Sequence, residues 1–327
     1  MGKEINYDDI AKISGVSKAT VSKVINNYSG VSEKSREKVI DACKKLDYTP
    51  NFLARSLRLN KTNSIGLIVP DLSNQFFSRF SKGVHQEALK NNYTVLIGDS
   101  LESSDIEKKL VKEFSARKVD GLIIISTNQN NNYPNSQIPI VFSDRHVEGA
   151  KNEIFSDNFL GGYKGMDFLV NRKKRERILI LSGPKRFQTN QQRLSGCVEF
   201  ILNHNPGVNY EIREIETVDV ENAELYAIKN FQFIKSFDAI FALSDLLALG
   251  VMKVIRNKVK IPEDISVLGY DDIKECEYVT PELSSIHQKK KTMGIEAFNM
   301  ILSLINEEKL SNDKIVLSVD VIERSST

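Results

Sequence analysis

Two groups of residues in this chain carry side chains that can bind a partner. The first group lies in GVSKATVSKVINN, residues 15–27, where hydroxyl, ammonium and amide groups follow one another without a single acidic residue. Such a surface donates hydrogen bonds and positive charge, so it fits a partner rich in acceptors and negative charge. The candidate contact residues are Ser17, Lys18, Ala19, Thr20, Ser22, Lys23 and Asn26.

The second group consists of polar and aromatic residues that follow apolar runs in the rest of the chain. Asp144 and Arg145 end the run PIVFSDR, and Asp271 lies in LGYDD. Groups that donate and accept hydrogen bonds beside aromatic faces are typical of a pocket for a small polar molecule. The full set is Asn74, Phe76, Phe77, Asp144, Arg145, Arg193, Asp245, Asp271 and Gln288.

Three short helices are expected to position the first group. Asn6 can cap a helix over residues 7–14, with Asp9 in the capping-box position, and Gly15 can end it. Ser17 can cap a second helix over 18–26, and a third runs from Ser32 to about residue 46. Two helices joined by a tight glycine turn predict a helix-turn-helix, whose second helix enters the DNA major groove. A purely structural helix pair has the same pattern.

The DNA interpretation gives each exposed residue of the second helix a role. Lys18 can donate to a guanine, and Ala19 can touch a thymine methyl group. The remaining donors, Thr20, Ser22, Lys23 and Asn26, can hold base edges or phosphate oxygens. Charge placement fits this interpretation, since residues 1–61 hold twelve Lys or Arg against seven Asp or Glu in a chain of net charge +2.

A different pattern begins at about residue 64. Apolar runs rich in β-branched residues, such as SIGLIVPD, DGLIIIS, RILILSGP and AIFALSD, alternate with helical stretches that include 189–203, 221–235 and 245–257. This alternation predicts parallel sheets with crossover helices. Because the pattern restarts after about residue 158, we expect two α/β subdomains with a ligand cleft between them. The GGYKG stretch at 161–165 is expected to allow close helix packing.

Several function classes have no support in the sequence. No apolar run is long enough to span a membrane, and the first residues lack the apolar region of an export signal, so we expect a cytoplasmic protein. The three cysteines and four histidines show no metal-ligand spacing, and no nucleophile or phosphate loop is recognisable. We therefore expect neither an enzyme nor a bound cofactor or metal.

The stretches YDDIAKISGVSKATVSKVINN and KLDYTPNFLARSL strongly resemble the head and hinge of LacI/GalR-type bacterial transcription regulators. The resemblance implies an α/β fold with an N-terminal three-helix helix-turn-helix head, a hinge helix, and two doubly wound subdomains of the periplasmic-binding-protein type. The expected domains are the head at 1–49, the hinge helix and linker at 50–61, and the core at 62–327. The core divides into subdomain one (62–158 and 289–317) and subdomain two (159–288 and 318–327).

The hinge segment over 51–59 is too short to form a stable helix alone in water. By resemblance, two such helices of a dimer pair in the minor groove, where Leu57 is the wedge and Ala54 lies beside it. A linker helix with Leu57 in a domain core is the alternative. The resemblance also implies a homodimer that binds a palindromic operator. Because no leucine heptad follows VDVIERSST, we expect a dimer rather than a tetramer.

Matched to the family and its periplasmic relatives, the cleft residues resemble a ribose-type sugar site. Phe76 and Phe77 resemble the stacking pair, and Asp144, Arg145 and Arg193 the partners of ring hydroxyls. Ser244 and Phe187 depart from the pattern, and Phe187 stands where purine-responsive members carry arginine. The family thus implies a repressor of carbohydrate-utilisation genes that a small sugar releases. The alternatives are a regulator with a phosphosugar or a phosphorylated carrier protein as corepressor, and a sugar-binding protein without DNA function.

Overall fold

The computed structural model describes residues 5–25, 28–48, 61–128, 130, 133 and 136–327. It divides into two compact units, Met1–Thr62 and Asn63–Thr327, which are described separately. The predicted contact residue Asn26 and the hinge residues Ala54 and Leu57 lie outside the described residues.

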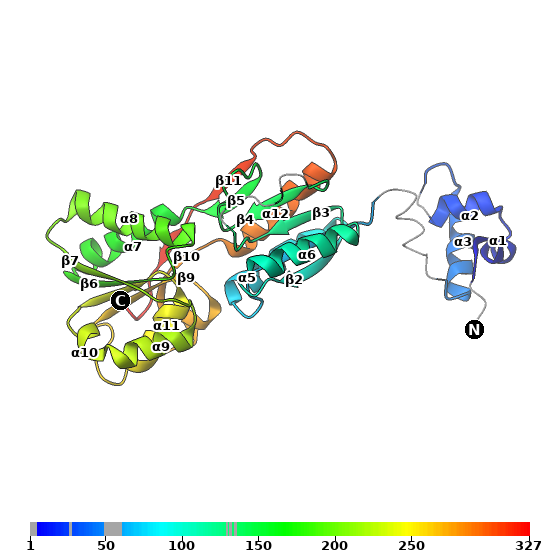
Figure 1. Ribbon diagram of the computed structural model, residues 1–327. Coiled ribbons are helices and arrows are strands. Elements are labelled where there is room, and N and C mark those ends of the chain that lie inside the picture. The colour runs from blue at the N-terminus through cyan, green and yellow to red at the C-terminus, as the bar shows by residue number, and fades with distance from the viewer. Residues whose placement is uncertain (1–4, 26–27, 49–60, 129, 131–132, 134–135) are drawn as a thin grey trace. The chain divides into compact units, whose positions relative to one another are not determined.

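The head unit contains three helices, α1 (Tyr7–Ser14), α2 (Lys18–Ile25) and α3 (Glu33–Lys45) (Figure 1). The predicted capping box of α1 is present, because Asn6 Oδ1 accepts from the Asp9 amide at 3.2 Å and Asp9 Oδ2 accepts from the Asn6 amide at 3.0 Å. Gly15 ends α1 with a φ of 67°, a conformation that glycine adopts without steric cost. Ser17 caps α2 as predicted, since its Oγ accepts from the Thr20 amide at 3.1 Å.

One small apolar core holds these three helices together. Ile10 of α1, Val21 of α2 and Val39 of α3 are fully buried, and Val24 and Ala42 are nearly so. Burial of Val21 and Val24 fixes which side of α2 faces outward. That side carries the hydroxyl and ammonium groups.

The first lobe of the core unit is a six-stranded sheet with all neighbouring strands parallel. Its order is β11-β5-β4-β3-β1-β2. Its strands are β1 (Ser64–Val69), β2 (Thr94–Asp99), β3 (Gly121–Ile124), β4 (Ile140–Ser143), β5 (Glu153–Ser156) and β11 (Lys314–Leu317). Leu67 and Val69 pack toward α5 (Gln75–Lys90) and α12 (Lys290–Ile305), whereas Ile68 packs toward α6 (Ser104–Ala116).

The second lobe repeats this arrangement with the order β12-β10-β9-β8-β6-β7. Its strands are β6 (Arg177–Ser182), β7 (Asn209–Glu214), β8 (Ala239–Ala242), β9 (Ser266–Asp271), β10 (Ser284–His287) and the antiparallel β12 (Asp320–Ile322). One face is covered by α7 (Asn158–Asp167), the π-helix η1 (Phe168–Arg172) and α8 (Gln188–His204). The other is covered by α9 (Val220–Lys229), α10 (Phe231–Ile234) and α11 (Asp245–Ile255). A short 3-10 helix, η2 (Lys274–Glu277), follows β9.

The helix expected over 221–235 is instead two helices, α9 and α10, which meet at Asn230. Asn230 Nδ2 donates to the Tyr226 carbonyl at 2.9 Å, so its side chain competes with the continuing helix.

Helices α7 and α8 pack closely through glycines, as GGYKG predicted. A Cβ atom on Gly162 would lie 1.9 Å from the Arg193 carbonyl oxygen, and one on Gly196 would lie 2.0 Å from the Phe159 carbonyl oxygen. Because any side chain there would separate the helices, the two glycines fix the position of α8 and of the Arg193 that it carries.

The sheets show that the chain crosses between the lobes three times. It leaves the first lobe after β5, returns after β10 to form α12 and β11, and leaves again before β12. No helix within the described ranges is long and apolar enough to span a membrane.

Candidate ligand cavity and helix-turn-helix surface

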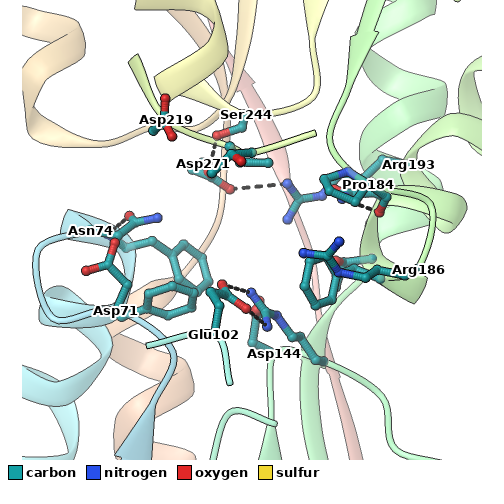
Figure 2. Close-up of a pocket in the computed structure, with 18 of the residues that line it drawn as sticks. Asp71, Asn74, Glu102, Asp144, Pro184, Arg186, Arg193, Asp219, Ser244 and Asp271 are labelled. Atoms are coloured by element: carbon teal, nitrogen blue, oxygen red, sulfur yellow. Dashed lines mark hydrogen bonds and ion pairs between the residues drawn. The ribbon is translucent and has the colours of Figure 1, made fainter. Parts of the chain in front are cut away.

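A cavity of about 260 Å³ lies between the two lobes, at the carboxyl ends of their parallel strands (Figure 2). This edge is where open α/β sheets bind ligands, because the loops that follow the strands converge there. Seven of the nine predicted residues line the cavity: Asn74, Phe76, Phe77, Asp144, Arg145, Arg193 and Asp271.

Asp144 and Asp271 are the buried carboxylates of the cavity, one from each lobe. Asp144 directly follows β4, and Asp271 is the last residue of β9. Their φ angles are positive, 61° for Asp144 and 115° for Asp271, which is uncommon for residues other than glycine. Asp144 Oδ1 is buried and makes no hydrogen bond in the part of the chain that the structure describes. A buried acceptor without a donor is costly, so Asp144 is suited to a donor supplied by a ligand.

Arg193 is held in one orientation before any ligand binds. Its Nε donates to Asn158 Oδ1 and its Nη1 to the Leu243 carbonyl, both at 2.8 Å. The guanidinium carbon also lies 3.8 Å from the ring centre of Tyr270. Nη1 is 3.5 Å from Asp271 Oδ1, so the guanidinium group and the carboxylate face the cavity together (Figure 2).

Burial sets the protonation behaviour of these carboxylates. It raises the pKa of Asp144 to about 6, although the positive charges of Arg193 and Arg145 oppose the shift. Burial also raises the pKa of Asp271, again against Arg193. The cavity therefore favours partners that donate hydrogen bonds to oxygen, since these stabilise the ionised carboxylates.

Arg145 lines the cavity, but its guanidinium group is mainly engaged with other side chains of the protein. Its two terminal nitrogens donate to Glu102 at 2.7 and 2.9 Å, which is a bidentate pair. Its guanidinium lies 4.3 Å from the ring centre of Phe187 in the second lobe and 5.8 Å from that of Phe77 in the first. Arg145 thus joins the two lobes at the rim of the cavity.

Phe76 and Phe77 form an edge-to-face pair with ring centres 5.3 Å apart. Asn74 positions them, because its Oδ1 caps α5 by accepting from the Phe76 amide at 2.9 Å. Both rings are buried among the core residues of the first lobe and reach the cavity wall. They supply an apolar surface to the cavity that Arg193 also lines.

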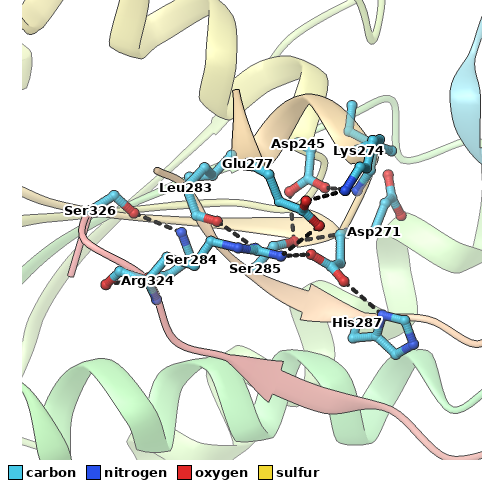
Figure 3. A network of polar contacts seen from close by, with 12 residues as sticks. Asp245, Asp271, Lys274, Glu277, Leu283, Ser284, Ser285, His287, Arg324 and Ser326 are labelled. Atoms are coloured by element: carbon cyan, nitrogen blue, oxygen red, sulfur yellow. Dashed lines mark hydrogen bonds and ion pairs between the residues drawn. The ribbon is translucent and has the colours of Figure 1, made fainter. Parts of the chain in front are cut away.

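Asp245 and Gln288, the other two predicted residues, do not line this cavity. Both are fully buried next to Asp271. Asp245 Oδ2 accepts from the Ile273 amide at 2.9 Å and its Oδ1 from Ser285 Oγ at 2.6 Å, while Gln288 Nε2 donates to Asp271 Oδ1 at 2.7 Å. These bonds support the wall that carries Asp271 (Figure 3).

Sequence reasoning missed several lining residues. They are Asp71, Glu102, Pro184, Arg186, Thr189, Asn190, Glu216, Thr217, Val218 and Asp219, and Phe187 and Ser244 were noted only as departures from a family pattern. Glu102 follows β2, and Glu216 and Asp219 follow β7. The same signal, a polar residue after a strand, would have found these three if it had been applied to every strand.

Six of the predicted contact residues of the head lie within the described residues, in α2 and just before it. Ser17, Lys18, Ala19 and Lys23 are exposed, and Thr20 and Ser22 are half-buried. Lys18 Nζ pairs with Asp8 Oδ2 at 2.7 Å, but both side chains are mostly exposed, so this pair is weak and can exchange for another acceptor. In the described part of the chain no group of His, Cys, Asp or Glu could hold a metal ion.

Two family models match separate parts of the chain. Residues 6–51 match the model of bacterial regulatory proteins of the lacI family, and residues 166–327 match that of the periplasmic binding protein-like domain. The ribose operon repressor of Bacillus subtilis (strain 168) is 33% identical over 322 residues, which cover 98% of this chain and 97% of that protein. The repressor PurR of Vibrio cholerae serotype O1 (strain M66-2) is 31% identical over 325 residues, which cover 97% and 96%.

Among solved structures, a periplasmic binding protein/LacI transcriptional regulator from Alkaliphilus metalliredigens QYMF, complexed with D-xylulofuranose, superposes with a TM-score of 0.75. It is 26% identical, and the match covers 81% of this chain and 99% of that one. Full-length similarity above 30%, together with the helix-turn-helix head and the two-lobed core, leads to one conclusion. The chain belongs to the lacI family of bacterial regulatory proteins and is a DNA-binding repressor of transcription.

Proposed function

We propose that this repressor binds a near-palindromic operator as a homodimer and that a small neutral sugar in the cavity controls its affinity for DNA. The observation that carries the sugar assignment is the pairing of buried carboxylates with an oriented arginine. Asp144 and Asp271 accept, and Arg193 donates, within one cavity of about 260 Å³. Sugar hydroxyls both donate and accept, so they match this arrangement.

The charge of the cavity wall favours a neutral ligand over a phosphosugar. Six carboxylates face three guanidinium groups, and two of these, Arg145 and Arg193, already lie beside carboxylates. Among the described residues, a phosphate group would find one guanidinium without a carboxylate beside it, Arg186, and would meet a surplus of negative charge from the six carboxylates. This composition argues against the phosphosugar alternative at this site.

A pentose is the sugar that we favour. The ribose operon repressor of Bacillus subtilis is a full-length relative, and the similar solved structure holds D-xylulofuranose. The edge-to-face pair of Phe76 and Phe77 supplies the apolar surface on which one ring can rest. Release from the operator is the expected direction of the switch.

The relatives named PurR raise a nucleobase as a second candidate effector. Its ring N–H groups could donate to the unpartnered Asp144 Oδ1. The residue at position 187 argues against a nucleobase. Phe187 lines the cavity where an arginine would be needed to donate to a purine carbonyl, and the guanidinium group of Arg145 already stacks on its ring. The sugar therefore remains our proposal.

Calorimetry on the full-length protein tests the choice. Ribose, xylose, xylulose, glucose, ribose 5-phosphate, guanine and hypoxanthine are titrated separately at pH 7. The proposal expects saturable heat from at least one neutral pentose, and it expects Asp144→Asn to weaken that binding. Binding of a purine base with no response to any neutral sugar would contradict it.

On the head, we propose that Lys18 and Ala19 read bases and that Ser17, Thr20, Ser22, Lys23 and Asn26 hold base edges or phosphates. Exposure of Lys18 and Ala19 on the acid-free side of α2 supports this division. The proposal extends to Ala54 and Leu57 as minor-groove contacts of the hinge. Footprinting that showed no palindromic protection would contradict it.

A further inference from the structure

A second pocket of about 390 Å³ lies where the chain crosses from the second lobe to the first, at residues 287–292. We call it the crossover pocket. Its walls come from Gln75 and Arg79 of α5 in the first lobe and from Asp272, Lys274 and Glu277 of the second lobe. The lobes touch at its edge, because Gln75 Nε2 donates to Glu275 Oε1 at 2.9 Å.

The crossover pocket is rich in positive charge. Its lining contains five cations against two carboxylates, and the cations are Arg79, Lys274, Lys289, Lys290 and Lys291. Both carboxylates are already neutralised: Asp272 accepts from Arg324 Nη2 at 2.7 Å and is bonded to His287, and Glu277 pairs with Lys274 (Figure 3).

Among the described residues, two of these cations have neither a hydrogen-bond partner nor an ion-pair partner for their side chains. Arg79 and Lys291 are exposed and form no ion pair with any residue that the structure describes. Lys289 Nζ contacts only a neutral hydroxyl, Ser318 Oγ, at 2.8 Å. The pocket therefore has a surplus of cations available to an anion.

The start of α12 adds to this surplus. The helix begins at Lys290, and no side chain caps its first amides. The N-terminal end of a helix carries partial positive charge, so lysines at 289–291 are placed where cations are least favourable. An anion bound here would compensate both the helix end and the lysines.

A separate feature points to a ligand that also carries a hydroxyl group. Gln288 lines the crossover pocket and is fully buried, yet its Oε1 has no hydrogen-bond partner among the described residues. Its Nε2 is committed to Asp271. The carbonyl oxygen of this amide therefore lacks a donor, which a ligand hydroxyl can supply.

We propose that the crossover pocket is a second effector site, which binds a phosphate monoester of a small polyhydroxylated metabolite. The phosphate lies against Arg79, Lys291 and the start of α12, and a hydroxyl donates to Gln288. The acid-lined cavity and this pocket then select opposite ligands, a neutral sugar in one and a phosphorylated molecule in the other.

The two sites share the segment that holds Asp271. Gln288 Nε2 bonds Asp271 Oδ1, and Lys290 Nζ donates to the backbone carbonyls of Asp271 and Asp272, the latter at 2.9 Å. A ligand that shifts residues 288–291 therefore shifts a wall of the sugar cavity. Each ligand changes the affinity of the other by the same factor, which is required of coupled sites. This regulatory step rests on the proposed function, whereas anion binding does not.

The test is calorimetry of the full-length protein with ribose 5-phosphate and, separately, with inorganic phosphate. We compare the wild type with Arg79→Ala and Lys291→Ala, and use Lys309→Ala as the control because Lys309 is an exposed lysine outside the pocket. Both exposed pocket variants should weaken ribose 5-phosphate binding about tenfold or more, since each removes a charged contact. The control should bind like the wild type.

Ribose titrations of the same variants separate this proposal from the proposed function. Unchanged ribose binding in Lys291→Ala, with weakened ribose 5-phosphate binding, supports the second site. If ribose does not bind at all but ribose 5-phosphate binds with this variant pattern, the sugar assignment fails and the anion site stands. Absence of heat with both anions, equal affinity in all variants, or loss of ribose 5-phosphate binding only in Asp144→Asn would overturn the anion site.

Discussion

Arg193 Nη1 lies 3.5 Å from Asp271 Oδ1 at the cavity wall, and both side chains are about nine-tenths buried. The glycine contacts of α7 and α8 bring α8 to this place, and the strand end of β9 brings the carboxylate. A charge pair with so little solvent depends on both partners, because removal of one leaves the other buried and uncompensated. The proposed sugar site is therefore sensitive to the position of the donor groups that α8 carries.

Replacement of Arg193 by lysine tests that geometry. Lysine keeps the charge but cannot make the Nε bond to Asn158 and the Nη1 bond to Leu243 from one planar group. We expect sugar affinity to fall at least about tenfold, which corresponds to roughly 1.4 kcal/mol. Calorimetry with the sugar identified for the wild type measures it. Arg117→Lys is the control, because Arg117 is an exposed residue that directly follows α6. An affinity in Arg193→Lys equal to that of the wild type would refute the role of Arg193.

The pH dependence of stability follows from Asp144. Burial raises its pKa in the folded state from 3.8 to about 6, so the folded protein binds more protons than the unfolded chain between these values. The free energy of unfolding should therefore fall as pH rises from about 4 to 6, by up to about 3 kcal/mol. The side chain introduced by Asp144→Asn cannot ionise, so the free energy of unfolding of this variant should not show this fall between pH 4 and 6.

Urea unfolding followed by circular dichroism at pH 4, 5, 6 and 7 checks the difference between wild type and Asp144→Asn. The variant should be the more stable protein at pH 7 and should converge with the wild type toward pH 4. Parallel pH profiles of the two proteins would show that Asp144 is not the group responsible.

Gly162→Ala tests the close packing of α7 on α8. Its new Cβ would lie 1.9 Å from the Arg193 carbonyl, which is backbone and cannot rotate away. We expect a loss of stability of about 1–3 kcal/mol or more, together with weaker sugar binding, because α8 must move. Gly207→Ala is the matched control, since nothing lies within 4 Å of its new Cβ. Thermal melts that are equal for both variants would contradict the packing argument.

The head makes its own prediction through Lys18 and Lys23. Lys18→Ala should relax the preference at one base pair and cost roughly 1–3 kcal/mol on the best operator. Lys23→Ala should weaken all sequences alike and reduce the dependence on salt. Competition binding with single-base operator variants distinguishes the two patterns. A uniform loss in Lys18→Ala would assign it to phosphate contact instead.

The sequence was sufficient for features that depend on local chemistry. The capping box of Asn6 and Asp9, the glycine stop at Gly15 and the long buried strands follow from residue types a few positions apart. The strands β5, β11 and β12 were not foreseen, because each is short and begins with a charged residue, unlike the equally short β3, β4 and β8. These segments become strands because they form backbone hydrogen bonds with a neighbouring strand of the sheet, which a local sequence pattern does not reveal.

The cavity was predictable only in part, for a physical reason. A polar residue after a strand can face the cavity or support it from behind, and the sequence pattern is the same in both cases. Asp271 and Asp245 illustrate this, since the first lines the cavity while the second is bonded to the Ile273 amide and Ser285 beside it. The crossover pocket unites α5 with residues two hundred positions away, which no local pattern indicates.

The most direct test of the account is fluorescence anisotropy of the full-length protein on an operator duplex selected from random DNA, measured with and without neutral pentoses. We expect tight binding that weakens steeply with salt, and a change in affinity of about tenfold or more when the correct sugar fills the cavity. Indifference to duplex DNA at low ionic strength, or the same operator affinity with and without a sugar shown by calorimetry to bind, would contradict it.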